Sequence, residues 1–511
     1  MAASHVHGVR ACALVGWAGL VLLLAFAAVP SVAAAAPPGA GCDNRNNNTI
    51  EKLLACADLD GARAHQATFQ EIADANGGTR ASGTPGYDKS VDHVVDRMTS
   101  WGYDVSVQQF EFPFFHEASP AELEQLAPVT ATYETGTFTY SGSGDVTGGV
   151  VPVDLSLADP AASTSGCEAG DFAGLDLSGG ADIALIQRGA CFFLDKALNA
   201  QQAGAEAVVI FNQGTDGREG LIVGTLTEEA VGVITVPVVG ATFPAGQALA
   251  QAGSVARVFA DTLSEIRTTE NVLAQTRRGR TDNVVMAGAH LDSVPDGPGI
   301  QDNGTGSAAL LEIAQAMRKV KPENAVRFAW WGAEEFGLIG SEHYVNSLSQ
   351  EEQDNIALYL NFDMIGSPNY VRFVYDGDGS AFGLAGPDGS GAIEELFVDF
   401  YADRGLASEP TEISFRSDYA AFFDVGIPFG GLFTGAEGIK TAEQQAIYGG
   451  TVGEQYDPCY HLACDTFDNI SLEVFDLNID AVAAAVLTYA SSTESINGVP
   501  GRPVPASQRA A

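Results

Sequence analysis

The pattern of apolar and polar positions predicts a helix and a strand near the start of the chain. Between residues 87 and 101, apolar side chains recur at the i, i+3, i+4, i+7 spacing of one helix face. The residues on this face are Val91, Val94, Val95 and Met98. A strand is expected directly after this helix, over 103–112.

Beyond residue 263, the pattern changes to long apolar runs separated by amphipathic segments. The runs 283–289, 326–331 and 357–362 lack polar alternation, as strands do when both faces of their sheet are covered. A helix around Ile313 separates the first two runs, and a last helix is expected over 472–491. This alternation predicts an α/β fold with helices on both faces of the sheet.

Residues 126–262 differ in character from the segments on both sides. They are rich in Gly, Thr, Ser and Val, with short β-like runs, one helix and two cysteines of their own. An inserted β-rich domain explains this block. The chain is then divided into a leader (1–36), a first part of the main domain with an N-terminal extension (37–125), the insertion (126–262), a second part of the main domain (263–492) and a tail expected to be disordered (493–511).

The leader has the pattern of a secretory signal peptide. An apolar stretch over 11–29 follows Arg10 and ends at Pro30, and small residues suitable for cleavage follow at 33–35. An uncleaved anchor is the alternative, because the stretch approaches membrane-spanning length, but the small residues favour cleavage. We therefore expect a secreted, extracellular protein that has no membrane partner after cleavage.

Composition excludes several classes of function. The 511 residues include 25 Lys+Arg and 65 Asp+Glu, and the resulting net charge of −40 argues against binding to nucleic acid or an anionic membrane. With 46% apolar and only 18% charged residues, the chain has material for a large core and is not disordered over most of its length.

Six cysteines remain after the leader, and six thiols allow fifteen disulfide connectivities. Sequence proximity favours one bridge in each region, as is typical of a secreted chain. These pairs are Cys42–Cys56, Cys167–Cys191 and Cys459–Cys464. A cysteine–zinc site is less favoured, because the sequence contains no C-x-x-C.

Ionisable residues follow each of the three predicted buried strands, at the carboxyl ends where α/β sheets bind ligands. So many carboxylates would repel one another without a cation, and carboxylates mixed with imidazole favour zinc. Two histidines with three of these carboxylates are already too many for one tetrahedral zinc with an open position, and they suit two zinc ions that share a carboxylate. Two further candidates do not follow a strand, because Asp302 lies in the loop between the first two strands and His461 lies near the end of the chain. The candidates are His290, Asp292, Asp302, Glu334, Glu335, Asp363 and His461.

Four other histidines lack such neighbours in the sequence and are interpreted as surface or packing residues. They are His65, His93, His116 and His343.

Five runs in order along the chain resemble the secreted bacterial di-zinc leucyl aminopeptidases, which are related to aminopeptidase Y. The likeness covers residues 67–490 apart from the inserted block. It implies the zinc exopeptidase fold, with a mixed, mostly parallel sheet, and release of N-terminal residues, most often leucine and other large apolar ones. The runs are 287–293, 301–308, 328–341, 360–367 and 457–465.

The resemblance implies a role for each candidate residue. His290 and Asp363 would hold one zinc, Glu335 and His461 the other, and Asp302 would bridge the two. Asp292 would orient an imidazole, Glu334 would be the general base, and Tyr460 would stabilise the tetrahedral intermediate. The family pattern also implies a cis peptide bond between Asp302 and Asn303 and supports the Cys459–Cys464 bridge.

The resemblance further implies how a substrate is recognised. Glu334, Asp363 and the backbone of Arg416 would bind the free ammonium of a peptide, and Phe433 would form a wall of the apolar pocket for its first side chain. The expected partners are peptides with a free N-terminus, and the protein is expected to be a monomer.

The inserted block resembles a protease-associated domain on the runs 166–168, 186–193 and 203–205. This likeness implies that the domain covers the mouth of the active site or selects substrates, and a passive spacer is the alternative.

A calcium site is a further implication of the resemblance, because Asp476 and Asp480 lie on one face of the last helix and Asp58-Leu59 could complete the set. A solvated helix face is favoured in so acidic a chain.

Three other functions fit parts of the pattern. A carboxypeptidase of the same clan also carries a protease-associated domain, but the 330–335 run and the region of Phe433 favour an aminopeptidase. A non-catalytic, receptor-like relative would have lost zinc ligands, and a glutaminyl cyclase would hold a single zinc. All five ligand positions are filled in this sequence.

Overall fold

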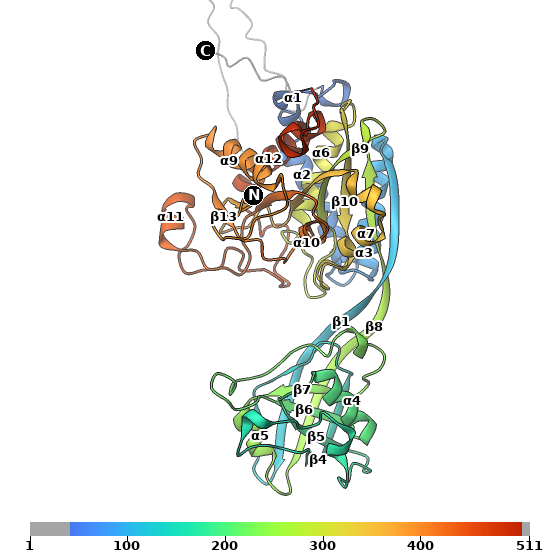
Figure 1. The fold of residues 1–511 in the computed structure, drawn as a ribbon, viewed down its shortest axis with the longest axis vertical. Helices are drawn as coiled ribbons and strands as arrows, with labels where there is room; N and C mark the ends of the chain where they lie inside the picture. Colours follow the sequence, from blue (N-terminus) through green and yellow to red (C-terminus); the bar gives the residue numbers. More distant parts are fainter. Residues whose placement is uncertain (1–40, 503–511) are drawn as a thin grey trace, which may run out of the picture.

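One hydrogen-bonded sheet extends through both lobes of the protein in the computed structural model, which describes residues 41–502 (Figure 1). The sheet has 14 strands among these residues, and their order along its main path is β13-β12-β14-β11-β9-β10-β8-β4-β5-β6-β7-β3. The signal peptide predicted over 1–36 and the last part of the predicted tail, 503–511, lie outside the described residues.

The main lobe has a parallel centre with antiparallel strands on either side. The centre consists of β14 (Phe429–Phe433), β11 (Ile356–Phe362), β9 (Arg280–His290) and β10 (Asn324–Trp331). Next to it lie β12 (Phe373–Tyr375), antiparallel to β14 and parallel to β13 (Glu409–Thr411), and β8 (Val255–Gln275), antiparallel to β10. The predicted mixed, mostly parallel sheet is therefore confirmed.

Helices cover both faces of this sheet. Successive residues of a strand point to opposite sides, and because the central strands are apolar throughout, both faces present apolar side chains that must be covered. In β9, Val285 and Ala287 face one core and Val284 and Met286 face the other. The first core is covered by α2 (Leu59–Ala75), α3 (Pro85–Trp101), α6 (Gly304–Met317), α9 (Ser390–Ala402) and α12 (Leu472–Ser491). The second is covered by α7 (Ile339–Ser347) and α10 (Tyr419–Asp424).

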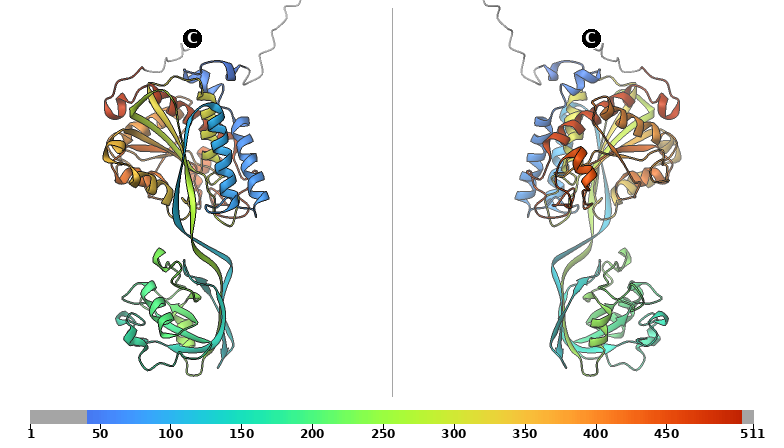
Figure 2. Two further views of the ribbon diagram at one scale, coloured as in Figure 1. Left: turned by 90° about the vertical axis from the view of Figure 1, so that its right-hand side faces the viewer. Right: turned by 90° about the vertical axis from the view of Figure 1, so that its left-hand side faces the viewer.

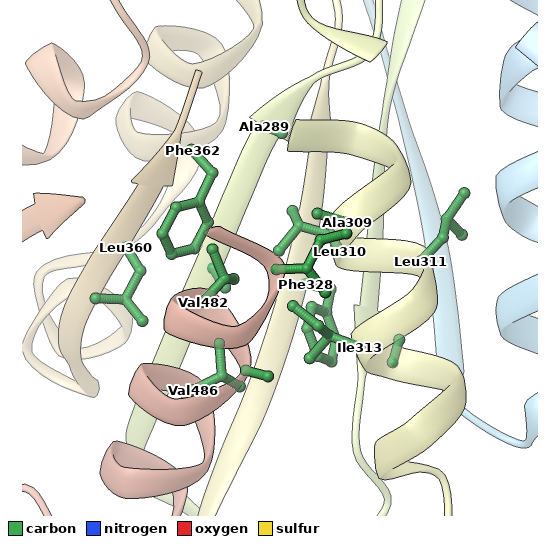
Figure 3. Close-up of a cluster of buried hydrophobic side chains, with 14 of the residues drawn as sticks. Ala289, Ala309, Leu310, Leu311, Ile313, Phe328, Leu360, Phe362, Val482 and Val486 are labelled. Carbon is green, nitrogen blue, oxygen red and sulfur yellow. The ribbon is translucent and has the colours of Figure 1, made fainter. Parts of the chain in front are cut away.

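Helices α6 and α12 lie side by side over the central strands (Figure 3). Ile313 of α6 and Val482 of α12 pack with Phe328 and Leu360 from the sheet, and all four are fully buried. Helix α12 is long and apolar enough to span a membrane by length and composition, but 72% of that window is buried inside the protein. It is therefore a core helix of the main lobe.

A long antiparallel ribbon joins the two lobes (Figures 1 and 2). It consists of β1 (Asp104–Ala127) and β8, which pair from Asp104 with Gln275 to Ala127 with Val255. The strand predicted over 103–112 is only the first part of β1. Both strands run across the boundaries predicted at 126 and 262, because the lobes share one sheet.

The inserted lobe is a smaller α/β unit that contains the Cys167–Cys191 disulfide. Its strands are β2 (Ala131–Tyr133), β3 (Thr135–Thr137), β4 (Gly144–Pro152), β5 (Asp182–Gln187), β6 (Ala207–Phe211) and β7 (Val238–Ala241). Its helices are α4 (Phe193–Ala203) and α5 (Phe243–Leu249), with short 3₁₀ turns at Pro160–Ala162, Ala169–Phe172 and Glu228–Ala230.

Residues near both ends of the described chain are tied to the main lobe. The Cys42–Cys56 disulfide closes the segment that holds a 3₁₀ turn (Cys42–Asn44) and α1 (Ile50–Leu54). The first residues of the tail predicted to be disordered over 493–511 instead form α13 (Glu494–Asn497). The reason is a polar anchor, because Asn283 donates to Thr493 Oγ1 and accepts from the Asn497 side-chain amide, both at 2.8 Å.

Candidate active site

The carboxyl ends of β9, β10 and β11 meet at one edge of the sheet. Trp331 lies opposite His290 in the β9–β10 register, and Asn361 lies opposite Gly288 in the β9–β11 register. His290 is therefore level with the start of the segments that carry Glu334 and Asp363. Because β8 enters the main lobe from the insertion and runs antiparallel to β10, this edge faces the inserted lobe (Figure 1).

Asp302 reaches the same edge from the loop that precedes α6. The peptide bond between Asp302 and Asn303 is cis, as the family resemblance implied. The Asn303 side chain caps α6 by accepting from the Gly306 N–H at 2.9 Å. Gly306 is needed at this point, since a Cβ there would lie 2.2 Å from the carbonyl oxygen of Phe362. The start of α6 is thereby held directly against the end of β11.

The two carboxylate oxygens of Asp302 face different histidines. Oδ1 lies 3.1 Å from His290 Nε2, and Oδ2 lies 3.3 Å from His461 Nε2. His290 Nε2 also lies 3.2 Å from Asp363 Oδ1, and His461 Nε2 lies 3.0 Å from Glu335 Oε2. Asp302 therefore belongs to two adjacent groups, each with one imidazole and one further carboxylate.

Burial and mutual interaction displace the pKa values in these groups. Burial would raise the pKa of Asp302, but hydrogen bonds with His290 and His461 outweigh it and hold the pKa below its ordinary value. Burial raises the pKa of Glu335 to about 7, with a further contribution from the charge of Asp302. Burial works against protonation of His461, yet Asp302 and Glu335 raise its pKa to about 10. The carboxylates thus attract positive charge to this edge.

Glu334 lies beside the first of these groups. Its Oε2 is 3.9 Å from His290 Nε2, and its backbone N–H donates to Asp292 Oδ1 at 3.3 Å. Burial, followed by the negative charges of Asp363 and Glu335, raises the pKa of Glu334 well above its ordinary value, although His290 opposes the shift. The carboxylate is therefore held close to the cluster without an ion-pair contact as short as those of its neighbours.

Asp292 contacts the imidazole of His290 mainly through its backbone. Its carbonyl oxygen lies 3.1 Å from His290 Nδ1, whereas its carboxylate Oδ1 lies 3.7 Å away. The backbone contact fixes the ring so that Nε2 points toward Asp302 and Asp363. The other carboxylate oxygen of Asp292 is buried and has no hydrogen-bond partner.

Tyr460 lies against His461, and Arg416 contacts Tyr460. The Tyr460 ring stacks on His461 with ring centroids 3.8 Å apart, and its hydroxyl accepts from Arg416 Nη2 at 3.2 Å. Arg416 is paired with Glu437 at 2.6 Å. The Cys459–Cys464 disulfide closes the loop that carries Tyr460 and His461.

Both histidines of the cluster, its four carboxylates, Arg416 and Tyr460 line a cavity of about 490 Å³. The cluster gives this cavity a charged part, and other parts of its wall are apolar. The apolar part includes Met364, Tyr375, Phe415 and Phe433. A charged part and an apolar wall in one cavity suit a ligand that has an ionic group next to an apolar side chain.

The inserted lobe also approaches this edge. A second cavity, of about 600 Å³, is lined by the ribbon at 115–121, by Thr135 and Gly136 of the insertion, and by Pro295 and Asp296 from the loop between β9 and Asp302. The loop that carries Asp302 is therefore bordered by both lobes.

The residues considered for calcium gather less tightly. Asp58 caps α2 by accepting from the Gly61 N–H at 2.9 Å. Burial raises the pKa of Asp476, and the charges of Asp58 and Asp60 raise it further, so these acids lie near one another. Burial, then the charge of Asp476, raises the pKa of Asp480 to about 6. The described residues contain no set here with ligand atoms all within 4.8 Å.

Several residues that support the site are absent from the sequence-based set. Asp465 accepts from the N–H groups of Gln301 and Asp302 at 2.8 and 3.0 Å, and Ser417 donates to Asp363 Oδ2 at 2.7 Å. The buried guanidinium of Arg80 donates to the carbonyl groups of Pro298 and Gly299. The only signal for any of them is that Asp465 ends one of the motif runs.

Both lobes of the chain match known protein families. Residues 271–486 match peptidase family M28, and residues 146–249 match the PA domain. The chain is 53% identical over 435 residues to an aminopeptidase of Pseudomonas aeruginosa, which covers 84% of this chain and 80% of that protein.

A fungal relative and a solved bacterial structure extend this likeness. The chain is 43% identical to a probable leucine aminopeptidase 2 of Aspergillus fumigatus, over 82% of this chain and 80% of that protein. It superposes on a zinc aminopeptidase from Bacillus subtilis with a TM-score of 0.57 and 26% identity, over 84% of this chain and 94% of that structure.

Proposed function

The chain belongs to peptidase family M28 and is a zinc-dependent aminopeptidase, and from this premise we propose that it is exported and removes large apolar N-terminal residues with two zinc ions bound at the strand ends. The observation that carries the proposal is the position of the Asp302 carboxylate, whose two oxygens face two different histidines. A carboxylate in this position suits a bridge between two cations.

The donor set fits zinc. Each group combines imidazole with carboxylate, which is the mixture that zinc prefers over magnesium or calcium. Glu335 Oε1 is buried without a hydrogen-bond partner, and such an oxygen is costly unless a cation or water occupies the space beside it. His290, Asp302 and Asp363 would hold one ion, and Asp302, Glu335 and His461 the other.

The proposed mechanism assigns separate tasks to the residues around the ions. A zinc pair bound by these residues would supply a water that is nucleophilic at neutral pH, and the metal would polarise the scissile carbonyl. Glu334 accepts the proton of the attacking water at its carboxylate and returns it to the leaving amine. The Tyr460 hydroxyl donates to the oxygen on which negative charge develops.

Substrate selection follows from the charged part and the apolar wall of the cavity. Glu334 and Asp363 supply negative charge for the free ammonium of a peptide, and Phe433 borders the space for its first side chain. The likeness to the Aspergillus fumigatus protein named as a probable leucine aminopeptidase supports an apolar preference. Export is supported by the apolar leader and by the three disulfides, which are typical of oxidising compartments.

Two measurements test the proposal. Leucine 4-nitroanilide should be hydrolysed, whereas N-acetyl-leucine 4-nitroanilide and an N-acetylated dipeptide with C-terminal glutamate should not. Metal analysis of the active protein should give about two zinc ions per chain. Cleavage of the acetylated anilide would contradict recognition of the ammonium, and a single zinc at full activity would contradict the bridging role of Asp302. N-terminal sequencing of protein recovered from the culture medium tests export.

A further inference from the structure

A second cluster of acids lies between β12 and α9, away from the strand ends that hold the proposed zinc ligands. The sequence after β12 reads Asp-Gly-Asp-Gly-Ser at 376–380, and Glu394 faces it from α9. Asp376, Asp378 and Glu394 each place one carboxylate oxygen within 4.8 Å of the others. The two aspartates are two residues apart, so both can face one point from a tight loop.

Asp376 is fully buried, and only one of its two oxygens is satisfied. Oδ2 accepts from the N–H groups of Ala381 and Phe382 at 3.1 and 2.8 Å. Oδ1 is buried and has no hydrogen-bond partner. Leaving a buried carboxylate oxygen without a partner is unfavourable, and in native proteins such an atom calls for a bound ion or water.

Backbone groups orient the other two carboxylates without neutralising them. Asp378 Oδ1 accepts from the Ser380 N–H at 2.8 Å, and Glu394 Oε2 accepts from the Asp378 N–H at 3.1 Å. Among the residues that the structure describes, no ion pair joins Arg, Lys or His to any of the three acids. Three preoriented negative charges therefore surround one point with no positive charge from the protein.

We propose that Asp376, Asp378 and Glu394 bind one Ca²⁺ that joins the end of β12 to α9. The donors are all oxygen, with no imidazole or thiolate, which disfavours zinc. Calcium accepts six to eight oxygen ligands in irregular geometry, and waters can complete the shell on the exposed side of Asp378. Magnesium demands near-ideal octahedral geometry and is less suited to a loop of this kind.

The position of this ion links it to the active-site cavity. Tyr375, the last residue of β12, precedes Asp376 and lines the cavity, where its ring packs against Tyr419 with centroids 4.8 Å apart. β12 also pairs with β14, with Phe373 opposite Phe433. The Ca²⁺ would therefore hold β12, which supplies Tyr375 to the cavity and pairs with the strand that carries Phe433.

The test uses zinc-loaded, full-length protein from which calcium has been removed, titrated with CaCl₂. Equilibrium dialysis measures the bound Ca²⁺, and thermal unfolding measures its effect. The wild-type protein should bind Ca²⁺ with a Kd of about 10⁻⁴–10⁻³ M, the range of extracellular sites, and its Tm should rise by about 2–5 °C at saturation.

The double variant Asp378→Asn/Glu394→Gln keeps acceptors for both backbone N–H groups but removes two charges. It should bind one Ca²⁺ fewer and lose the rise in Tm, while its Tm without calcium should equal or exceed that of the wild type, because carboxylate repulsion is relieved. A purely structural role for these acids predicts the opposite, a lower Tm without calcium.

Matched variants identify the site. Glu395→Gln removes the neighbouring exposed charge on α9, and Asp476→Asn/Asp480→Asn removes the other candidate calcium ligands. Both should retain the Ca²⁺ bound at the loop and most of the rise in Tm. The proposal is overturned if the wild type binds no Ca²⁺, or if the Asp378→Asn/Glu394→Gln variant binds as much as the wild type.

Discussion

The carboxylate of Asp465 accepts a hydrogen bond from the backbone N–H of Asp302 at 3.0 Å. The same carboxylate accepts from the N–H of Gln301, so it fixes the segment that positions the proposed bridging ligand. Burial raises the pKa of Asp465 to about 8. The hydrogen bonds from its backbone donors lower this pKa, and the negative charges of nearby acids raise it. Asp465 therefore acts on the cluster through the backbone.

Asp465→Ala should weaken zinc binding, because two buried N–H groups lose their acceptor and the Asp302 segment is no longer fixed. We expect zinc affinity to fall about 10- to 100-fold, as for other residues that orient metal ligands. Competition with a chelator measures this affinity. Asp468→Ala, at an exposed position three residues away, is the control and should leave it unchanged. Equal zinc affinity in both variants would contradict the role of Asp465.

Glu334→Gln should abolish most activity while leaving the metal content intact. The amide keeps the size of the side chain but cannot accept a proton, and general-base catalysis contributes about 10²- to 10⁴-fold. We therefore expect kcat to fall by about that factor, with about two zinc ions still bound. Steady-state kinetics and metal analysis on the same sample provide the measurement. Loss of zinc in this variant would show that Glu334 is a ligand instead of the base.

Tyr460→Phe should lower kcat more than it changes KM. The phenolic hydroxyl contacts Arg416, and the ring stacks on His461, so removal of the oxygen alone preserves the stacking. Loss of one donor to a developing oxyanion costs about 10²- to 10³-fold in kcat. Tyr456→Phe is the matched control, since that hydroxyl donates to Gln444 outside the cavity at 2.8 Å. A rise in KM with kcat unchanged would place Tyr460 in substrate binding.

The core of the main lobe could be predicted from the sequence, because its strands are continuous apolar runs. The runs at 283–289, 326–331 and 357–362 lie within β9, β10 and β11, and the helix expected over 472–491 is α12. Alternation of these strands with helices forces their carboxyl ends to one edge, so the residues that follow them come together. His290, Glu334 and Asp363 could be placed near one another for this reason.

The ribbon between the lobes and the supporting residues could not be predicted in the same way. Residues 115–122 of β1 are all partly buried or exposed, so this part of the strand lacks the alternation of buried and exposed positions that identifies a strand, and only 103–112 was expected. Asp465, Ser417 and Arg80 act through hydrogen bonds to groups more than 50 positions away in the chain. Neither periodicity nor local motifs carry information about such contacts.

His65 and His93, interpreted from the sequence as surface or packing residues, form a pair between α2 and α3. His65 Nδ1 lies 3.0 Å from His93 Nε2, and the His65 ring is buried. Burial, followed by the neighbouring positive groups, lowers the pKa of His65 to about 3, and burial and Arg97 lower that of His93 to about 4. Both rings are therefore neutral in the folded protein at pH values where an unfolded histidine is already protonated.

This difference predicts that the free energy of unfolding falls as the solution is acidified. Above about pH 6.5 these histidines are neutral in both the folded and the unfolded state, so the free energy of unfolding does not lose their contribution. Between pH 6.5 and about 4 the unfolded state binds more protons than the folded state. Each histidine therefore lowers the free energy of unfolding by about 1.4 kcal/mol for each pH unit of acidification. Urea unfolding at about pH 7.5, about pH 6 and about pH 5 measures the slope.

His65→Gln should reduce the slope of the unfolding free energy with pH by the contribution of about one proton, because one of the two titrating rings is gone. His116→Gln, on the ribbon between the lobes, is the control and accounts for the loss of one histidine elsewhere. Comparison of the two variants cancels the titration of the proposed zinc ligands, which both retain. If the two variants show the same dependence of unfolding free energy on pH, the paired histidines do not make the fold sensitive to acid.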